Sequence, residues 1–172
     1  MQQEYAHLEL SATVNLAVPM EYVEETIAIA WAEICPIPGV PDGVLGVIDR
    51  GGKLLWVVEL ADFLSDILGL SAIARSHGDE LTVGILCNSP REEKRQGDDR
   101  PPLVRQVGIA IGAFRGTLSV NPDEFQPIPP QWAPAIASLI SQVAWVNPPN
   151  SPRMFPLGVL DIPAFFHALN PQ

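Results

Sequence analysis

The chain has 172 residues, 47% of them hydrophobic, and a formal net charge of −10 at pH 7. This size suits one domain or two small subdomains with a sizeable apolar interior. Such an acidic chain attracts neither nucleic acid nor anionic lipid, so we expect neither as a partner. The sequence opens with no basic, apolar leader and contains no run of about 18 apolar residues, so we expect a cytoplasmic protein without membrane insertion.

Eighteen prolines and thirteen glycines divide the chain into short segments, which favours many short strands over long helices. Alternating apolar and polar residues predict a strand at Leu8–Leu10, with Leu16–Val18 as its hairpin partner. The alternation of Ile27, Ile29 and Trp31 predicts a further strand that ends near Trp31.

The centre of the chain predicts a tight hairpin followed by a helix. Two apolar runs, Val44–Ile48 and Leu54–Leu60, are joined by a four-residue link that ends in Gly51-Gly52. Glycine adopts positive φ without a Cβ clash, so this link fits a hairpin turn. Helical spacing follows over Ala61–Leu68, and Gly69 is placed to end that helix.

The second half of the chain continues the same pattern of short elements. Its strand-like runs are Leu81–Cys87, Gln106–Ile111, Ala113–Val120, Gln142–Val146 and Met154–Leu160. The polar tract Asn88–Pro102 predicts an exposed loop, and Ala135–Ile140 a short helical turn. Asp161 followed by Pro163–Leu169 predicts a C-terminal helix, because proline fits the first helical turn. About ten short strands indicate an all-β protein, and two small barrels accommodate them better than one.

No catalytic, cofactor or metal site can be recognised in the sequence. His7, expected before the first strand, is far along the chain from His77 and His167, and no metal-ligand spacing, nucleophile elbow or phosphate loop appears. The adjacent carboxylates Glu24 and Glu25 would point to opposite faces of a strand, which prevents joint acid–base chemistry. We therefore expect no enzyme activity, no cofactor and no metal.

Two other residue types suggest burial or binding. Cys35 and Cys87 are expected to be reduced, with Cys87 as a small buried side chain. Trp56 lies in a run that is apolar on both faces, so its strand is either buried on both sides or shows one face to a partner.

Several short motifs, in order, resemble CheW-like domains, the scaffold domains of bacterial chemosensory arrays. The resemblance runs from about Leu8 to Leu169, and the order and spacing of the motifs make it specific. The segments that carry it are Leu16–Pro19, Val23–Glu25, Ile37–Pro41, Gly46–Asp49, Lys53–Leu60, Val107–Ile109 and Leu160-Asp161.

The resemblance implies an all-β fold, with two five-stranded SH3-like barrel subdomains around a shared apolar core in a single domain over residues 1–172. It also implies a non-enzymatic adaptor that couples a CheA-type histidine kinase to chemoreceptors in a chemotaxis or phototaxis system. The kinase regulatory domain would bind barrel edges, and receptor tip helices would bind the groove between the barrels. The residues expected to contact these partners are Val23, Glu25, Ile37, Pro38, Val44 and Arg50.

The chain also departs from the family pattern. Gly51 stands where the family has an arginine, and Arg50 precedes it by one place, a displacement that reverses side-chain direction in a strand. Trp56 replaces a usual proline, Glu59 a usual aspartate, and Gly112 another aspartate. One alternative is therefore a divergent member that binds another signalling partner without activating the kinase. Another is a small-molecule-binding or hydrolytic β-barrel protein, which would require a deep pocket with converging polar groups.

Overall fold

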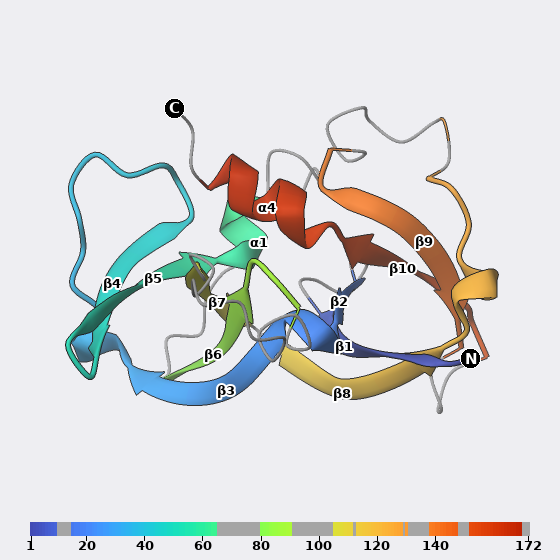
Figure 1. Ribbon diagram of the computed structural model, residues 1–172, viewed down its shortest axis with the longest axis horizontal. Helices are drawn as coiled ribbons and strands as arrows, with labels where there is room; N and C mark the ends of the chain where they lie inside the picture. Colours follow the sequence, from blue (N-terminus) through green and yellow to red (C-terminus); the bar gives the residue numbers. More distant parts are fainter. Residues whose placement is uncertain are drawn as a thin grey trace, which may run out of the picture. The chain divides into compact units, whose positions relative to one another are not determined.

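The computed structural model describes residues 1–9, 15–64, 80–90, 105–111, 113–128, 130, 138–147 and 152–169 (Figure 1). The chain divides into two compact units: unit 1 comprises Met1–Met20 and Ala113–Gln172, and unit 2 comprises Glu21–Gly112. Each unit carries one five-stranded sheet, which confirms the predicted all-β fold with two five-stranded subdomains. That both units share one apolar core and form a single domain stays a prediction.

The sheet of unit 1 is formed by β1 (Gln3–Glu9), β2 (Asn15–Pro19), β8 (Ala113–Val120), β9 (Ile140–Val146) and β10 (Phe155–Leu160). The strand order is β8-β1-β2-β10-β9, and only β2 and β10 pair in parallel. The predicted β1–β2 hairpin and the final β9–β10 pair are confirmed. Alternate residues face an apolar cluster whose buried members are Tyr5, Ala17, Val120, Ala144, Leu157 and Val159.

Two helical elements in unit 1 are each preceded by a residue whose side chain caps the helix. The 3-10 helix η4 (Pro122–Glu124) follows Asn121, whose side chain accepts a hydrogen bond from the amide of Asp123. The helix α4 (Ile162–Ala168) follows Asp161, whose Oδ1 accepts from the amide of Ala164 at 3.0 Å. These caps satisfy amide groups that the helices leave unpaired. The predicted C-terminal helix is confirmed.

The sheet of unit 2 is formed by β3 (Val23–Ala30), β4 (Val44–Arg50), β5 (Lys53–Glu59), β6 (Glu80–Cys87) and β7 (Gln106–Ile111). The strand order is β3-β6-β7-β5-β4, so β3 and β4 are the edges and the ladder of strands is not closed. The short helices η2 (Trp31–Glu33) and α1 (Leu60–Phe63) accompany it, and η1 (Met20–Tyr22) includes the point in the sequence where unit 1 gives way to unit 2. The buried cluster of this unit consists of Ile29, Ile48, Leu55, Val57, Val83, Ile85 and Ala110.

Several boundaries differ from the sequence-based expectations. Strand β1 begins at Gln3 and includes His7, which is buried because its Nε2 lies 2.9 Å from Asn15 Oδ1 and its ring stacks on Phe155. Strand β3 begins at Val23, because its ladder with β6 extends to Leu86.

The predicted helical turn at Ala135–Ile140 was wrong at its last residue, because Ile140 is buried and opens strand β9. Residues 65–69 of the predicted central helix and its stop lie outside the described residues. So do residues 91–102 of the predicted loop and residues 135–137 of the predicted turn.

A backbone bridge adds a segment to the free edge of β4. The amide of Cys35 donates to the carbonyl of Val47 at 2.8 Å, and the amide of Val47 donates back to the carbonyl of Cys35 at 2.9 Å. Gly46 makes this approach possible: its φ is +145°, and a Cβ there would lie 2.2 Å from the carbonyl oxygen of Cys35. Only glycine fits this position without backbone movement.

We predict that Gly46→Ala lowers the free energy of unfolding by at least about 3 kcal/mol, because it adds a backbone clash to an unfavourable φ. Gly39→Ala is the matched control: Gly39 has φ +77°, and an added Cβ would meet no atom within 4 Å. Its cost should be about 1 kcal/mol. Urea unfolding measures both, and equal losses would contradict the role assigned to the Cys35–Val47 bridge.

An ion pair joins the edge strand β8 to β1 in unit 1. Arg115 Nε donates to Glu9 Oε2 at 2.6 Å. This hydrogen bond, together with the positive charge of Arg115, holds the pKa of Glu9 below its ordinary value of 4.5. The pair therefore stabilises the fold above the pKa of Glu9 in the unfolded chain, and this stabilisation disappears as the pH falls through the lower, folded pKa.

We predict that Glu9→Gln lowers stability relative to the natural chain at pH 7, and that the difference shrinks toward zero as the pH falls below 4.5. Chemical unfolding at a series of pH values measures this difference. Arg115→Met should lose the same pH-dependent part of the free energy of unfolding, since it removes the other partner of the ion pair. A difference that stays constant down to pH 3 would show that the pair does not depress the pKa of Glu9.

Candidate protein interaction site

One end of the unit 2 sheet brings together polar side chains from all five strands. The antiparallel and parallel pairings place the start of β3, the end of β4, the start of β5, the end of β6 and the start of β7 at the same end. We call this end the Arg50 rim. Its residues are Glu24, Glu25, Arg50, Lys53, Leu54, Cys87 and Gln106.

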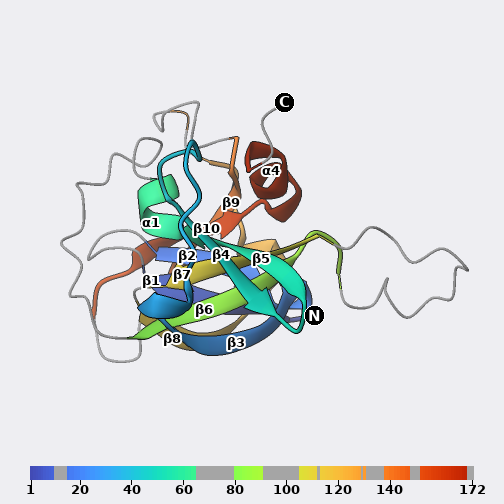
Figure 2. The same ribbon diagram turned by 90° about the vertical axis from the view of Figure 1, so that its left-hand side faces the viewer.

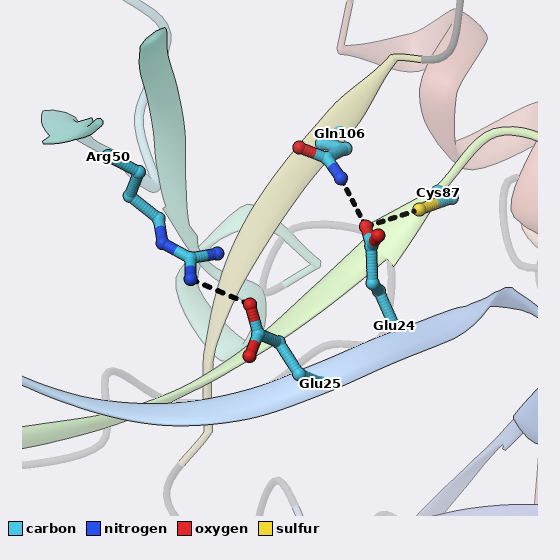
Figure 3. A network of polar contacts seen from close by, with 5 residues as sticks. All are labelled: Glu24, Glu25, Arg50, Cys87 and Gln106. Carbon is cyan, nitrogen blue, oxygen red and sulfur yellow. Dashed lines mark hydrogen bonds and ion pairs between the residues drawn. The ribbon is translucent and has the colours of Figure 1, made fainter. Parts of the chain in front are cut away.

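An ion pair spans the two edge strands at this rim. Arg50 Nη2 on β4 donates to Glu25 Oε1 on β3 at 2.6 Å, and both side chains are partly exposed, at 37% and 47% (Figure 3). The curvature of the sheet allows it, since the β4–β5 hairpin reaches toward the beginning of β3 (Figure 2). Two of the predicted contact residues are therefore neighbours. The one-place displacement of Arg50 does not turn it away from the site.

A second network involves the neighbouring carboxylate. The pairing of β3 with β6 shifts register between Val23 and Glu25, which marks a bulge at Glu24. Both carboxylates lie on the same side of β3 (Figure 3), so the expectation that they point to opposite faces was wrong. A bulge re-aims a side chain in this way. Glu24 Oε2 accepts from Cys87 Sγ at 3.1 Å and from Gln106 Nε2.

The rim borders a surface hollow of about 580 Å³, lined by Arg50, Gly51, Lys53, Leu54, Leu55 and Gln106. Leu54 is 72% exposed beside it. Trp56, two residues further along β5, is 43% exposed. The strand that carries Trp56 therefore shows part of one face to solvent and is not buried on both sides, while contact of that face with a partner stays a prediction.

The other predicted contact residues do not join the ion pair. Val23 opens β3 and is half-buried, whereas Val44 lies at the opposite end of β4 from Arg50. Ile37 is half-buried and Pro38 exposed, both between η2 and β4. Their roles as contacts stay predictions.

Sequence reasoning missed five members of the rim: Glu24, Lys53, Leu54, Cys87 and Gln106. The sequence predicted Gln106 only as the start of a strand. Its position next to β5 results from a long-range strand pairing, which local patterns do not reveal. For Lys53 a signal existed, because a tight turn at Gly51-Gly52 places it directly opposite Arg50.

The arrangement suits recognition by contact, with charged and amide groups beside exposed apolar ones. Within the described ranges, no cluster of histidine, cysteine, aspartate and glutamate could hold a metal ion. Neither Cys35 nor Cys87 forms a disulfide; Cys87 is buried, as expected, and Cys35 is exposed. Among the described residues, no helix has the length and apolar character needed to span a membrane.

Comparison with known proteins agrees with this architecture. A model of the CheW-like domain matches residues 7–167. The chain belongs to the CheW-like domain family. The crystal structure of the scaffolding protein TtCheW from Thermoanaerobacter tengcongensis is similar, with a TM-score of 0.63 and 15% identity over 94% of this chain and 90% of that one. At this identity the likeness shows the fold alone. No curated protein matches the chain.

The membership confirms the resemblance drawn from the sequence motifs. CheW-like domains are scaffold domains of chemotaxis signalling, so the chain belongs to a scaffold family. The matched region begins in β1 and ends in α4, and therefore includes both units.

We predict that Glu25 and Arg50 of this CheW-like domain are coupled by about 0.2–1 kcal/mol in the free energy of unfolding, the range for exposed ion pairs. A double-mutant cycle with Glu25→Gln and Arg50→Met measures the coupling, which should decrease in 1 M salt. Glu33→Gln with Arg50→Met is the control, because Glu33 bonds instead to the amide of Ala30. A coupling equal to that of the control would contradict the ion pair.

Proposed function

We propose that this CheW-like chain is a non-enzymatic, cytoplasmic adaptor that couples a CheA-type histidine kinase to chemoreceptors in a chemotaxis or phototaxis system. The observation that carries the proposal is the Glu25–Arg50 ion pair at an exposed rim. Two segments that resemble family motifs, Val23–Glu25 and the β4–β5 hairpin, meet there. The kinase would supply the catalysis, and this chain would position it.

The physical form of unit 2 supports such a role. Edge strands such as β3 and β4 offer backbone groups to which a partner strand can add. Exposed apolar side chains next to charged ones provide affinity and orientation together. We propose contacts with the kinase regulatory domain and receptor tip helices at Val23, Glu25, Ile37, Pro38, Val44 and Arg50.

We predict that the natural chain binds the regulatory domain of its cognate kinase, and that Arg50→Glu weakens binding at least tenfold. The substitution removes a cation and places a carboxylate beside Glu25, so the ion pair at the rim is replaced by two carboxylates that repel each other. Isothermal titration calorimetry measures both affinities. Arg115→Glu is the matched control, since it reverses the same charge and also breaks an exposed ion pair. It should bind like the natural chain, and a natural chain that binds neither kinase domain nor receptor tip would refute the proposal.

A second candidate is a divergent member that binds an array protein without activating the kinase. The displaced arginine and the exposed Trp56 at a usual proline position favour it. A reconstituted assay with kinase and receptor distinguishes the two candidates. The adaptor should raise kinase activity in the presence of receptor, and the divergent member should leave it unchanged.

A further inference from the structure

The strands of the two units follow one plan. Half 1 of the chain, residues 1–64, contains β1 to β5 and α1, and half 2, residues 80–169, contains β6 to β10 and α4. In unit 1 the strand order is β8-β1-β2-β10-β9, with β2–β10 as the parallel pair. In unit 2 the order is β3-β6-β7-β5-β4, with the parallel pair β7–β5 at the same place. Exchanging each strand of half 1 with the strand five places later converts one sheet into the other.

The correspondence extends to the bridges that cover the edge strands β4 and β9. Val47 and Val143 are each the fourth residue of their strand. Cys35 bridges Val47 and Gln126 bridges Val143, each through two backbone hydrogen bonds of 2.8 to 3.0 Å. Each bridging residue comes two places after a 3-10 helix, η2 in half 1 and η4 in half 2.

The ends of the two outer hairpins also correspond. The β4–β5 and β9–β10 ladders both shift register next to the first residue of the outer strand. Glu59 and Asp161 follow these hairpins as N-cap residues of α1 and α4. Their amides donate to the carbonyls of Gly43 and Leu139, the residues just before β4 and β9, at 2.7 and 2.8 Å. The two halves of the chain are therefore repeats of one structural pattern.

Neither repeat builds a sheet from its own strands. In unit 1, β1 and β2 of half 1 lie between β8 and β10 of half 2, and in unit 2, β6 and β7 of half 2 lie between β3 and β5 of half 1. Among the described strands, the ladders within one half are two-stranded hairpins: β1–β2, β4–β5, β6–β7 and β9–β10. An isolated hairpin is marginally stable in water, so each half needs the other to fold.

We propose that two copies of this chain exchange halves to form a dimer, in which half 1 of each copy folds with half 2 of the other. Each unit requires one half 1 and one half 2, and both buried clusters contain residues of both halves. Every strand pair and both clusters therefore form in the dimer as they do in a single chain. The difference is confined to the connection at residues 65–79, which joins the halves. Exchange of this kind is a low-cost route to a dimer.

Concentration decides between the two forms. Within one chain, the connection holds the two halves at an effective concentration on the order of 1 mM. We therefore expect closed monomers when the chain folds at about 1 µM, and exchanged dimers when it folds at about 1 mM. The exchange is independent of the proposed function, because it concerns how copies of the scaffold join and not which kinase they bind.

Disulfide trapping in the full chain tests the exchange, with Cys35→Ser removing the exposed natural thiol. Glu4→Cys with Ser119→Cys places thiols at directly opposed, exposed positions of β1 and β8, one in each half. Such positions lie within reach of a disulfide. The chain is unfolded, refolded under reducing conditions at about 1 µM or about 1 mM, and then oxidised. Light scattering after size exclusion should show dimers at the higher concentration, and a non-reducing gel should show their two chains covalently linked.

Asp49→Cys with Leu54→Cys is the matched control, because these exposed, opposed positions of β4 and β5 belong to the same half. In exchanged dimers this pair should form disulfides only within each chain, so the gel should show monomers. The proposal is overturned if the chain refolded at about 1 mM stays monomeric, or if the dimers contain within-chain disulfides for both pairs. Covalent dimers from the control pair would overturn it as well. Each of these results leaves the adaptor function untouched, since kinase binding by the monomer tests that separately.

Discussion

Strands β3 and β4 terminate the unit 2 sheet, and the contacts that hold β4 in place determine where the side chains of the Arg50 rim lie. The backbone bridge between Cys35 and Val47 supplies a hydrogen-bonded partner on the free edge of β4. Gly46 permits that approach, since any side chain there would meet the carbonyl of Cys35. With β4 fixed, its last residue, Arg50, comes within reach of Glu25 on the opposite edge.

The bulge at Glu24 explains how two adjacent carboxylates serve different contacts. Glu25 pairs with Arg50, while Glu24 accepts hydrogen bonds from Cys87 and Gln106 and so joins the ends of β3, β6 and β7. The Glu25–Arg50 pair is partly exposed, and such pairs contribute little to stability. Its value therefore lies in orienting charged groups at the surface, which agrees with a scaffold that recognises other proteins.

Much of the fold followed from local sequence patterns. The bounds of β7 and β8 were predicted to the residue, and the β4–β5 hairpin was predicted from Gly51-Gly52 between two apolar runs. The start of β1 was not predicted, because Gln3–His7 is polar in part and His7 is buried only through contacts with Asn15 and Phe155. These partners come from other strands, so no local pattern reveals them.

The site shows the same division between local and long-range information. Glu25 and Arg50 were predicted because each lies in a segment that resembles a family motif. The bulge at Glu24 depends on its pairing with β6, and Gln106 joins the rim only through its pairing with β5 and β6. Local sequence patterns do not specify such registers, which the folded sheet alone supplies.

The geometry of the β4–β5 turn explains why the arginine stands at position 50 and not at position 51. Position 51 has φ +61° and position 52 has φ +83°, values that favour glycine, so an arginine at 51 would be strained in this short turn. At position 50 it adopts ordinary strand geometry and still reaches Glu25. The same position flanks the turn, which sets Arg50 directly opposite Lys53. One local change in the hairpin thus keeps the ion pair with Glu25 at the rim.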